Sequence, residues 1–210
     1  MMTRIIVVAA VAVTASFAQQ WELAGMGGGS FLNNVGVTAP AGSAKAGFQA
    51  GAAFGGYVGY NSYKHIGGEL FYTFLQSNLR LSSGGQVATF SGNSHAIGYD
   101  LVFHTSEKEA KAQLFGIVGG GLKIFRGTGT EAAYQPLSNY GYFTRTQTLK
   151  PMLSFGGGVK VRLTDRVFLR GEVRDFLTAF PKDIIAPPPG VKYGTLLHDI
   201  VPMVGIGIDM

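Results

Sequence analysis

Residues 154–174 alternate between two kinds of side chain with a period of two residues. One set is apolar and comprises Phe155, Val159, Val161, Leu163, Val167, Leu169 and Val173. The other set is small or charged and comprises Gly156, Gly158, Lys160, Arg162, Arg170, Glu172 and Arg174. Successive side chains of a β-strand point to opposite faces, and Thr164-Asp165 interrupts the run near its middle. The pattern therefore predicts a tight hairpin with apolar side chains on one face and small or charged side chains on the other.

The same alternation recurs along the chain and predicts eight strands. They are expected at residues 21–31, 46–60, 66–81, 87–105, 111–126, 148–163, 166–180 and 196–210. The short turns between them are residues 61–65, 106–110 and 164–165, and the longer or more irregular connections are residues 32–45, 82–86, 127–147 and 177–195. An even number of strands, with short turns at one end and longer loops at the other, is typical of outer-membrane barrels.

Glycine and charge content indicate which face of these strands points outward. A soluble barrel such as a lipocalin also alternates, but it keeps its apolar face inside. Here the second face is rich in glycine, which offers no solvation, and charged residues make up only 14% of the chain, against about 25% in ordinary soluble domains. Small residues beside a few long polar ones fit the interior of a narrow barrel. We therefore predict an all-β fold, an eight-stranded antiparallel up-and-down transmembrane β-barrel, with a soluble barrel or sandwich as the alternative.

Residues 1–18 have the features of a secretory signal peptide. Arg4 precedes an apolar run, and small residues lead up to Ala18 before Gln19-Gln20. A basic start, an apolar stretch of about 7–15 residues and a small-residue cleavage site are typical of exported proteins. A short helix packed in a core is the alternative. We expect cleavage after Ala18, which leaves residues 19–210 as a single outer-membrane barrel domain, and no later apolar run approaches the roughly 20 residues that a transmembrane helix needs.

Two glycine-rich segments and one histidine-serine pair are the motifs that could carry chemistry. Residues 119–124 and 156–161 repeat a Gly-Gly-Gly-x-Lys pattern, but a phosphate-binding loop needs Gly-Lys-Ser or Gly-Lys-Thr before a helix. Strand glycines that line a crowded interior explain both segments. His104, Ser106 and Glu107 resemble part of the site of lipid A deacylase barrels. They fall at the periplasmic end of a predicted strand, where a polar strand end is the simpler interpretation.

No catalytic, metal, cofactor or nucleic-acid site is expected from the rest of the composition. The chain has no cysteine, which removes cysteine-based metal and nucleophile sites. The remaining histidines, His65, His95 and His198, fall in different predicted elements. A net charge of +5 is mild, and the basic residues gather on one strand face, which does not suit a nucleic-acid surface.

Charged residues on the predicted inward face are a more specific signal. They are Glu22, Glu69, Asp100, Lys160, Arg162, Arg170, Glu172, Arg174 and Asp209, and the predicted strands put all of them in the periplasmic half. Basic residues concentrate on two neighbouring strands and most acidic ones lie elsewhere, so closing the sheet brings opposite charges together across the lumen, where buried charges need partners. The network is interpreted as a structural plug, with a narrow path for ions or protons as the alternative.

Residues 156–174, reading GGGVKVRLTDRVFLRGEVR, resemble the penultimate hairpin of small outer-membrane barrels of the outer-membrane protein A-like and opacity-protein type. The resemblance implies a monomer that contacts outer-membrane lipid and lipopolysaccharide and uses the barrel-assembly machinery. Two departures stand out. The peptidoglycan-binding domain of many relatives does not follow residue 210, and Met210 stands where the family's C-terminal assembly signal usually has Phe.

The first functional hypothesis is a non-enzymatic barrel with a structural or surface-interaction role through its extracellular loops. The loop at residues 127–147 carries the candidate contact residues Tyr134, Tyr140, Tyr142 and Phe143. A narrow pore for ions or small solutes is the second hypothesis. The third is a lipid A-modifying barrel enzyme centred on His104.

Overall fold

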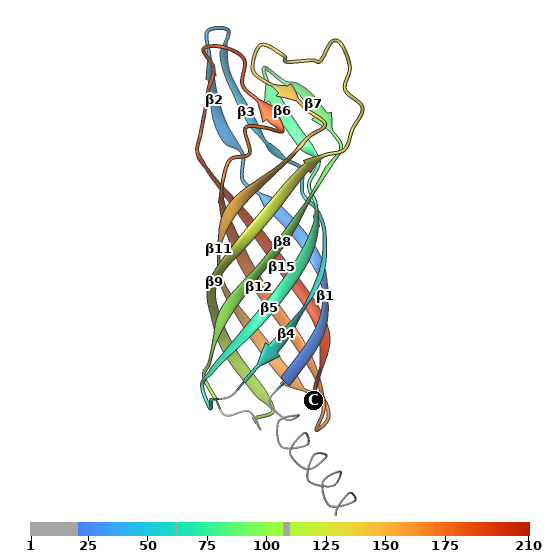
Figure 1. Cartoon of the computed structure of the whole chain (residues 1–210), viewed down its shortest axis with the longest axis vertical. Helices are drawn as coiled ribbons and strands as arrows, with labels where there is room; N and C mark the ends of the chain where they lie inside the picture. The colour runs from blue at the N-terminus through green and yellow to red at the C-terminus, as the bar shows by residue number, and fades with distance from the viewer. Residues whose placement is uncertain (1–20, 62, 107–109) are drawn as a thin grey trace, which may run out of the picture.

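A computed structural model describes residues 21–61, 63–106 and 110–210 as a tall closed β-barrel with a smaller sheet on top (Figure 1). The barrel strands are β1 (Trp21–Leu32), β4 (Gly51–Tyr60), β5 (Ile66–Gln76), β8 (Gly92–His104), β9 (Ala112–Gly127), β11 (Gln147–Arg162), β12 (Val167–Ala179) and β15 (Leu196–Asp209). Neighbours pair antiparallel in the order β1-β15-β12-β11-β9-β8-β5-β4, and β4 closes the ring on β1. The predicted fold class, an eight-stranded antiparallel barrel, is confirmed. The predicted signal segment lies outside the described residues.

The register of the barrel follows the alternation of the sequence. In the β11–β12 hairpin, Lys160 pairs with Arg170 and Val161 with Leu169. Lys160 and Arg170 are buried, whereas Leu169 on the opposite face is exposed. The outer wall is apolar all round, with exposed Leu, Val, Ile, Phe and Tyr side chains on every barrel strand. Among the described residues, no helix is long and apolar enough to cross a membrane.

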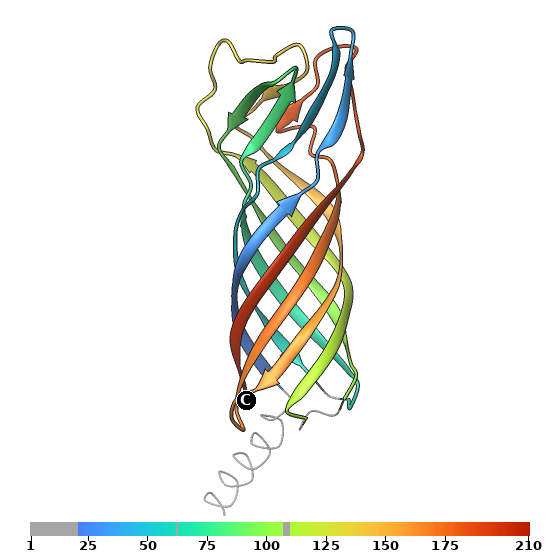
Figure 2. The ribbon, with the colours of Figure 1, turned by 180° about the vertical axis from the view of Figure 1, so that it is seen from behind.

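A second, smaller sheet stands above the end of the barrel that lies opposite the short turns (Figure 2). Its strands, in spatial order, are β14 (Lys192–Tyr193), β2 (Val35–Ala39), β3 (Gly42–Phe48), β6 (Leu79–Ser83) and β7 (Gln86–Phe90). A separate short ladder joins β10 (Tyr142–Phe143) to β13 (Ile185–Ala186). We call these strands and the segments between them the cap, and we call the two ends of the barrel the cap end and the turn end.

The cap corrects four of the expected strand and loop boundaries. The expected strand at 46–60 is two strands, because β3 ends at Phe48 and β4 begins at Gly51. The expected strand at 66–81 breaks between Gln76 and Leu79, and the one at 87–105 breaks at Ser91. The expected loop at 32–45 contains β2 and most of β3. Each break lies at the rim, where a chain segment leaves the barrel wall and joins the cap sheet.

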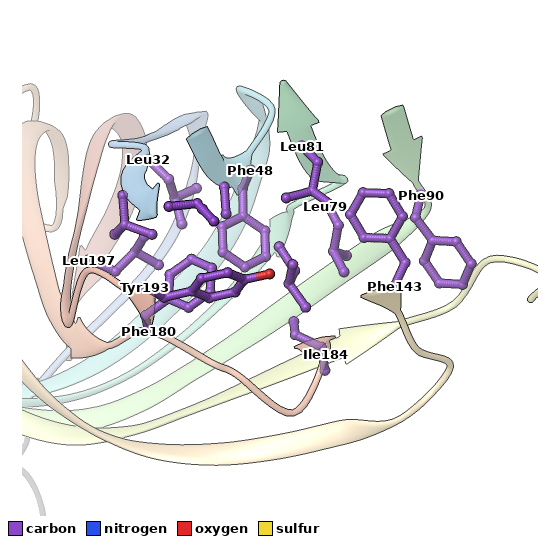
Figure 3. Close-up of a cluster of buried hydrophobic side chains, with 14 of the residues drawn as sticks. Leu32, Phe48, Leu79, Leu81, Phe90, Phe143, Phe180, Ile184, Tyr193 and Leu197 are labelled. Carbon is purple, nitrogen blue, oxygen red and sulfur yellow. The ribbon is translucent and has the colours of Figure 1, made fainter. Parts of the chain in front are cut away.

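The cap has a hydrophobic core of its own (Figure 3). Its buried members are Leu32, Val35, Val37, Ala44, Ala46, Phe48, Leu79, Leu81, Ala88, Phe90, Phe125, Phe143, Phe180, Ile184, Ile185, Tyr193 and Leu197. Side chains from the cap sheet meet others from the ends of the barrel strands and from the segment after β12, and Phe48 stacks on Phe125 with ring centroids 5.5 Å apart. The core therefore closes the cap end of the barrel and joins the cap to the wall.

Polar contacts fix the connecting segments of the cap. The Tyr193 hydroxyl donates to the carbonyl of Tyr140 at 2.7 Å, and burial raises the pKa of Tyr193. Asp183 accepts hydrogen bonds from Thr148 Oγ1 at 2.7 Å and from Lys150 Nζ at 3.2 Å. The Thr148 hydroxyl first, and then Lys150, hold the pKa of Asp183 below its usual range. These contacts attach the segment after β12 to the start of β11.

The apolar face of the strands changes from the outside to the inside where the barrel meets the cap. In the barrel most charged side chains point inward, and large exposed apolar side chains cover most of the outer wall. In the cap sheet, Leu79 and Leu81 point into the core, while Arg80 and Thr89 lie on the outer face. The barrel is therefore built for an apolar surrounding and the cap for water.

Candidate functional site

The lumen of the barrel contains ion pairs at three heights. The tier nearest the turn end joins Lys160 to Glu22 and Arg162 to Asp209, the second pair at 3.1 Å. Lys160 also lies 3.6 Å from Asp209. Asn61 Nδ2 donates to Glu22 Oε1 at 2.5 Å, so the Glu22 carboxylate has a cationic and a neutral partner. This tier joins β11 to β1 and β15, which are not its neighbours in the barrel.

The middle tier brings two guanidinium groups against three carboxylates. Arg170 binds both oxygens of Glu69, at 2.8 and 3.1 Å, and its Nε donates to Glu172 at 2.7 Å. Arg174 contacts Glu69, Glu172 and Asp100, the last at 2.5 Å. All of these side chains are nearly inaccessible to solvent. The structure therefore brings the expected charges of β12 together with those of β5 and β8.

The tier nearest the cap joins Lys123 to Asp199, and the sequence analysis missed both residues. Both side chains are fully buried, and Ser30 Oγ donates to the other oxygen of Asp199 at 2.7 Å. The alternation of the sequence could have placed both residues in the lumen. Lys123 alternates with the apolar outward residues of β9, and Asp199 lies ten residues before Asp209, so it shares the inward face of β15. Lys123 and Asp199 therefore extend the lumen charges beyond the nine expected residues, towards the cap end.

Aromatic rings fill the space between and around the tiers. The Arg170 guanidinium lies 4.3 Å from the Tyr57 ring and 4.2 Å from the Phe115 ring. Lys160 lies 4.3 Å from the Phe168 ring. Near Arg174, Phe71 stacks on Phe176 with centroids 5.6 Å apart. A cation over an aromatic face is favourable, more so where both are shielded from water.

The glycine-rich strand segments make room for these rings. A Cβ atom added at Gly158 would lie 2.8 Å from Cζ of Phe115, closer than ordinary van der Waals contact. A Cβ at Gly98 would lie 2.9 Å from two carbons of the Phe71 ring. The glycines thus let large rings from neighbouring strands cross the narrow lumen, which is the role that the strand interpretation gives them.

Polar residues also interrupt the outer wall, close to the cap end. Gln76, Asn93, Arg126 and Gln147 are register partners on four neighbouring strands and share the outward face. We call them the polar row. At the turn end the outer wall carries Trp21 and Tyr60, with ring centroids 4.9 Å apart. Amphipathic rings and polar side chains at the two ends of an apolar wall are typical of membrane interfaces.

Two hydrogen-bonded histidine pairs lie on the outer wall near the cap. Tyr72 Oη lies 2.7 Å from His95 Nδ1, and Asp175 Oδ2 lies 2.7 Å from His198 Nδ1. His198 also binds the start of the cap, because its backbone N–H donates to Asn33 Oδ1 at 2.8 Å. The pairs lie on different strands, and among the described residues no group of His, Cys, Asp and Glu has the arrangement of a metal site.

The histidine-serine pair at the turn end does not come together. His104 Nε2 faces Asn61 Oδ1 at 3.3 Å. Ser106 Oγ donates to the carbonyl of Ala112 at 3.4 Å, and Glu107 lies outside the described residues. The contacts of these two side chains are those of a polar strand end.

The four candidate contact residues of the 127–147 loop have different environments. Tyr134 is 79% exposed and Tyr142 is 45% exposed. Tyr140 is partly buried, and its hydroxyl donates to the carbonyl of Ala41 at 3.1 Å. Phe143 is buried in the cap core against Phe90. Phe143 is therefore a packing residue, and the expectation that it offers its ring to a partner is wrong.

Comparison with known proteins agrees with this architecture. The family model for the outer membrane protein beta-barrel domain matches residues 5–194. The fold is similar to outer membrane protein OprG from Pseudomonas aeruginosa, with a TM-score of 0.61, 13% identity, and 90% of this chain and 96% of that chain covered. It is also similar to Neisserial surface protein A, with a TM-score of 0.54, 11% identity, and 90% and 97% covered. No curated protein matches this chain.

The solved structures, at such low identity, show the fold alone, whereas the family model spans most of the chain. The closed barrel, the apolar wall and the interfacial residues at its two ends agree with that match. The chain belongs to the outer membrane protein beta-barrel domain family, and it is a transmembrane β-barrel of the Gram-negative outer membrane.

Proposed function

We propose that this protein is a non-enzymatic barrel that holds a rigid cap at the cell surface and acts through the outer surfaces of that cap. The observation that carries the proposal is the filled lumen, in which ion pairs and aromatic rings succeed one another from the turn end to the cap core. A lumen of this kind supports the wall and favours the plug over the ion path. If the lumen is blocked, the protein acts through the outer surfaces of the cap.

The outer face of the cap sheet supports contact with lipopolysaccharide. Lys192, Lys45 and Arg80 lie on this face, on β14, β3 and β6. Their neighbours on the same face are small or uncharged and include Gly36, Thr38, Ser43, Ser82, Val87 and Thr89. The phosphate groups of lipopolysaccharide carry the opposite charge, and complementary charge attracts a partner at low ionic strength.

Conductance in planar bilayers tests the filled lumen. Refolded wild-type protein should insert and pass no steady ion current. A matched variant with Arg170→Ala and Glu69→Ala, which removes an ion pair from the middle tier, should open measurable current if the tier is what blocks the path. Steady current through the wild-type barrel would overturn the plug and support the pore.

Binding of fluorescent lipopolysaccharide tests the cap face. Replacing Lys45, Arg80 and Lys192 with Ser should weaken binding in a salt-dependent manner, because each cation contributes through charge. The matched control replaces Lys111 and Arg166, which are exposed at the turn end, and should bind like the wild type. Equal binding by all three proteins would remove this face from the proposal. Lipid A mass spectra that change when the protein is expressed would contradict the non-enzymatic role.

A further inference from the structure

Strand β7 is one of the two edge strands of the cap sheet. It pairs with β6 on one side, and within the described residues its backbone makes no hydrogen bond to any other strand. An edge strand presents unpaired N–H and C=O groups to any extended chain that approaches it. Natural proteins commonly protect such edges with Lys, Pro, a bulge or a covering loop. β7 reads Gln-Val-Ala-Thr-Phe and contains neither Lys nor Pro.

The turn before β7 determines which backbone groups are free. Gly84 and Gly85 both have positive φ, as a two-residue type I′ hairpin requires. Ser83 and Gln86 are the closing pair of that hairpin, and hydrogen-bonded pairs alternate with non-bonded pairs along an antiparallel ladder. Val87 and Thr89 are therefore in non-bonded positions and direct their N–H and C=O groups away from β6. The free edge offers two donors and two acceptors at the spacing of a strand.

A loop stands beside this edge without pairing to it. The ladder between β8 and β9 continues to Ser91, whose carbonyl accepts from the N–H groups of Thr128 and Gly129 at 2.8 and 3.2 Å. Beyond Gly129 no backbone hydrogen bond joins the loop to β7 among the described residues. Gln135 fixes it farther along, because its side-chain amide donates to the Phe143 carbonyl at 2.9 Å and accepts from the Phe143 N–H at 2.8 Å. The loop is thus held as a second wall facing β7.

Between the two walls lies a recess of about 260 Å³, which we call the β7 groove. Its lining residues are Val87, Ala88, Thr89, Phe90, Thr130, Ala132, Tyr134, Gln135, Pro136 and Phe143. None of them is charged, and Phe90 stacks on Phe143 with centroids 5.6 Å apart. The groove is smaller than the roughly 300–1,000 Å³ of a drug-sized ligand site, so it suits side chains of a peptide better than a whole small molecule.

We infer that the β7 groove binds an extended peptide segment of a partner protein, which adds as a further strand to the cap sheet at Val87 and Thr89. This inference rests on the proposed role of the cap as an interaction surface. Backbone pairing supplies the attachment, and alternate side chains of the peptide enter the groove. The uncharged lining selects apolar or aromatic residues at those alternate positions. The opposite face of the added strand points to water and takes polar residues.

A labelled synthetic peptide with the sequence Thr-Phe-Thr-Val-Thr-Phe-Thr is a suitable probe, used with the full-length refolded barrel in detergent. Fluorescence polarisation should show saturable binding. The control is the same peptide with N-methyl groups on alternate residues. It keeps every side chain, but along one edge its backbone cannot donate hydrogen bonds to β7, and it should not bind. Absence of saturable binding by the first peptide, or equal binding by the methylated one, would overturn the inference.

Two variants test the edge itself. Val87→Pro with Thr89→Pro removes both outward donors and leaves the ladder to β6 intact, because proline is tolerated where the N–H faces away from a partner strand. Binding should weaken by about tenfold or more, since each net hydrogen bond contributes a modest amount. Val87→Thr keeps every backbone group and should bind nearly as well as the wild type. Circular dichroism and heat-modifiable gel mobility verify that each variant is folded.

Sedimentation separates a peptide partner from a second copy of the chain. The wild type should sediment as a monomer in detergent. A dimer that dissociates in the double-proline variant would identify another β7 as the occupant and overturn the inference of a different partner. Failure of the peptide experiments with normal lipopolysaccharide binding and no conductance would remove the groove and leave the proposed function standing.

Discussion

Arg174 joins the middle tier because its planar guanidinium donates in several directions at once. It contacts Glu69, Glu172 and Asp100, which come from three strands. Arg170 shares Glu69 and Glu172 with it, so the tier is a network and not a set of separate pairs. A lysine in place of either arginine would lose hydrogen bonds, because it lacks the planar guanidinium that binds a carboxylate through two nitrogen atoms.

Removal of one member of this tier should have unequal effects. Arg174→Ala leaves three carboxylates against one guanidinium and should lower the free energy of unfolding by about 3–5 kcal/mol, as expected when a buried charge loses its partner. Glu69→Gln should lower the free energy of unfolding by less, because Arg170 still pairs with Glu172 and Arg174 still pairs with Asp100. Urea unfolding in lipid vesicles measures both, with Arg166→Ala at the exposed turn as the control. Equal effects of the three changes would contradict the network.

Charge on the outer wall should be tolerated according to depth. Val173 lies near the middle of β12 and is 49% exposed on the outer wall, so Val173→Arg should cost about 2–4 kcal/mol. Leu101 lies nearer the turn end of β8, so Leu101→Arg should lower the free energy of unfolding by less. Leu163→Arg, beyond the end of β11, should be nearly neutral. Unfolding in vesicles that ranked the three in another order would contradict the depth assigned to these strands.

Sequence parity predicts where a side chain points but not what it meets. The alternation around Lys160, Arg170 and Arg174 is enough to direct them inward, because a slip of one residue would turn every charge to lipid. Their partners depend on how the strands stagger around the closed barrel, which no local pattern contains. Lys123 and Asp199 were missed for a simpler reason. Both lie three residues from an end of a predicted strand, where the boundary is least certain.

At the scale of elements, the strands were predictable and their division between two sheets was not. Phe48, Leu79, Leu81 and Phe90 alternate with small or polar residues as barrel strands do. A period of two indicates a strand but does not say which sheet it joins. Asn33-Asn34 and Pro40 favoured a loop at 32–45, whereas the apolar residues of β2 and β3 alternate well enough to form a hairpin once the cap core exists to bury them.

The β6–β7 hairpin should depend on its two turn glycines. Gly84 and Gly85 have φ of 54° and 83°, and a side chain in this left-handed region costs about 1–2 kcal/mol per residue. Gly84→Val should therefore increase hydrogen exchange of the β6 and β7 amides and leave the barrel amides protected. Gly171→Ala is the control, because no atom lies within 4 Å of its added Cβ. Unchanged exchange in the hairpin, or loss of protection in the barrel, would count against a separate cap hairpin.

At the scale of the whole molecule, closure depends on β15. This strand pairs with β1 on one side and β12 on the other, so its removal leaves two long unpaired edges. Lipid offers no partners for such edges. Deletion of residues 196–210 should abolish the compact, heat-modifiable form seen on a denaturing gel, whereas deletion of Met210 alone should preserve it. A compact form of the longer truncation would contradict closure by this strand.

The change of the apolar face from outside to inside at the rim also fixes the depth of the barrel in the membrane. Trp21 and Tyr60 mark one edge of the apolar wall, and the polar row with the cap above it marks the other. Sliding by one residue, about 3.3 Å, would push either Arg126 into the lipid tails or apolar side chains into water. The barrel therefore has a fixed depth in the membrane, and the β7 groove lies at a constant distance beyond the polar row, outside the lipid.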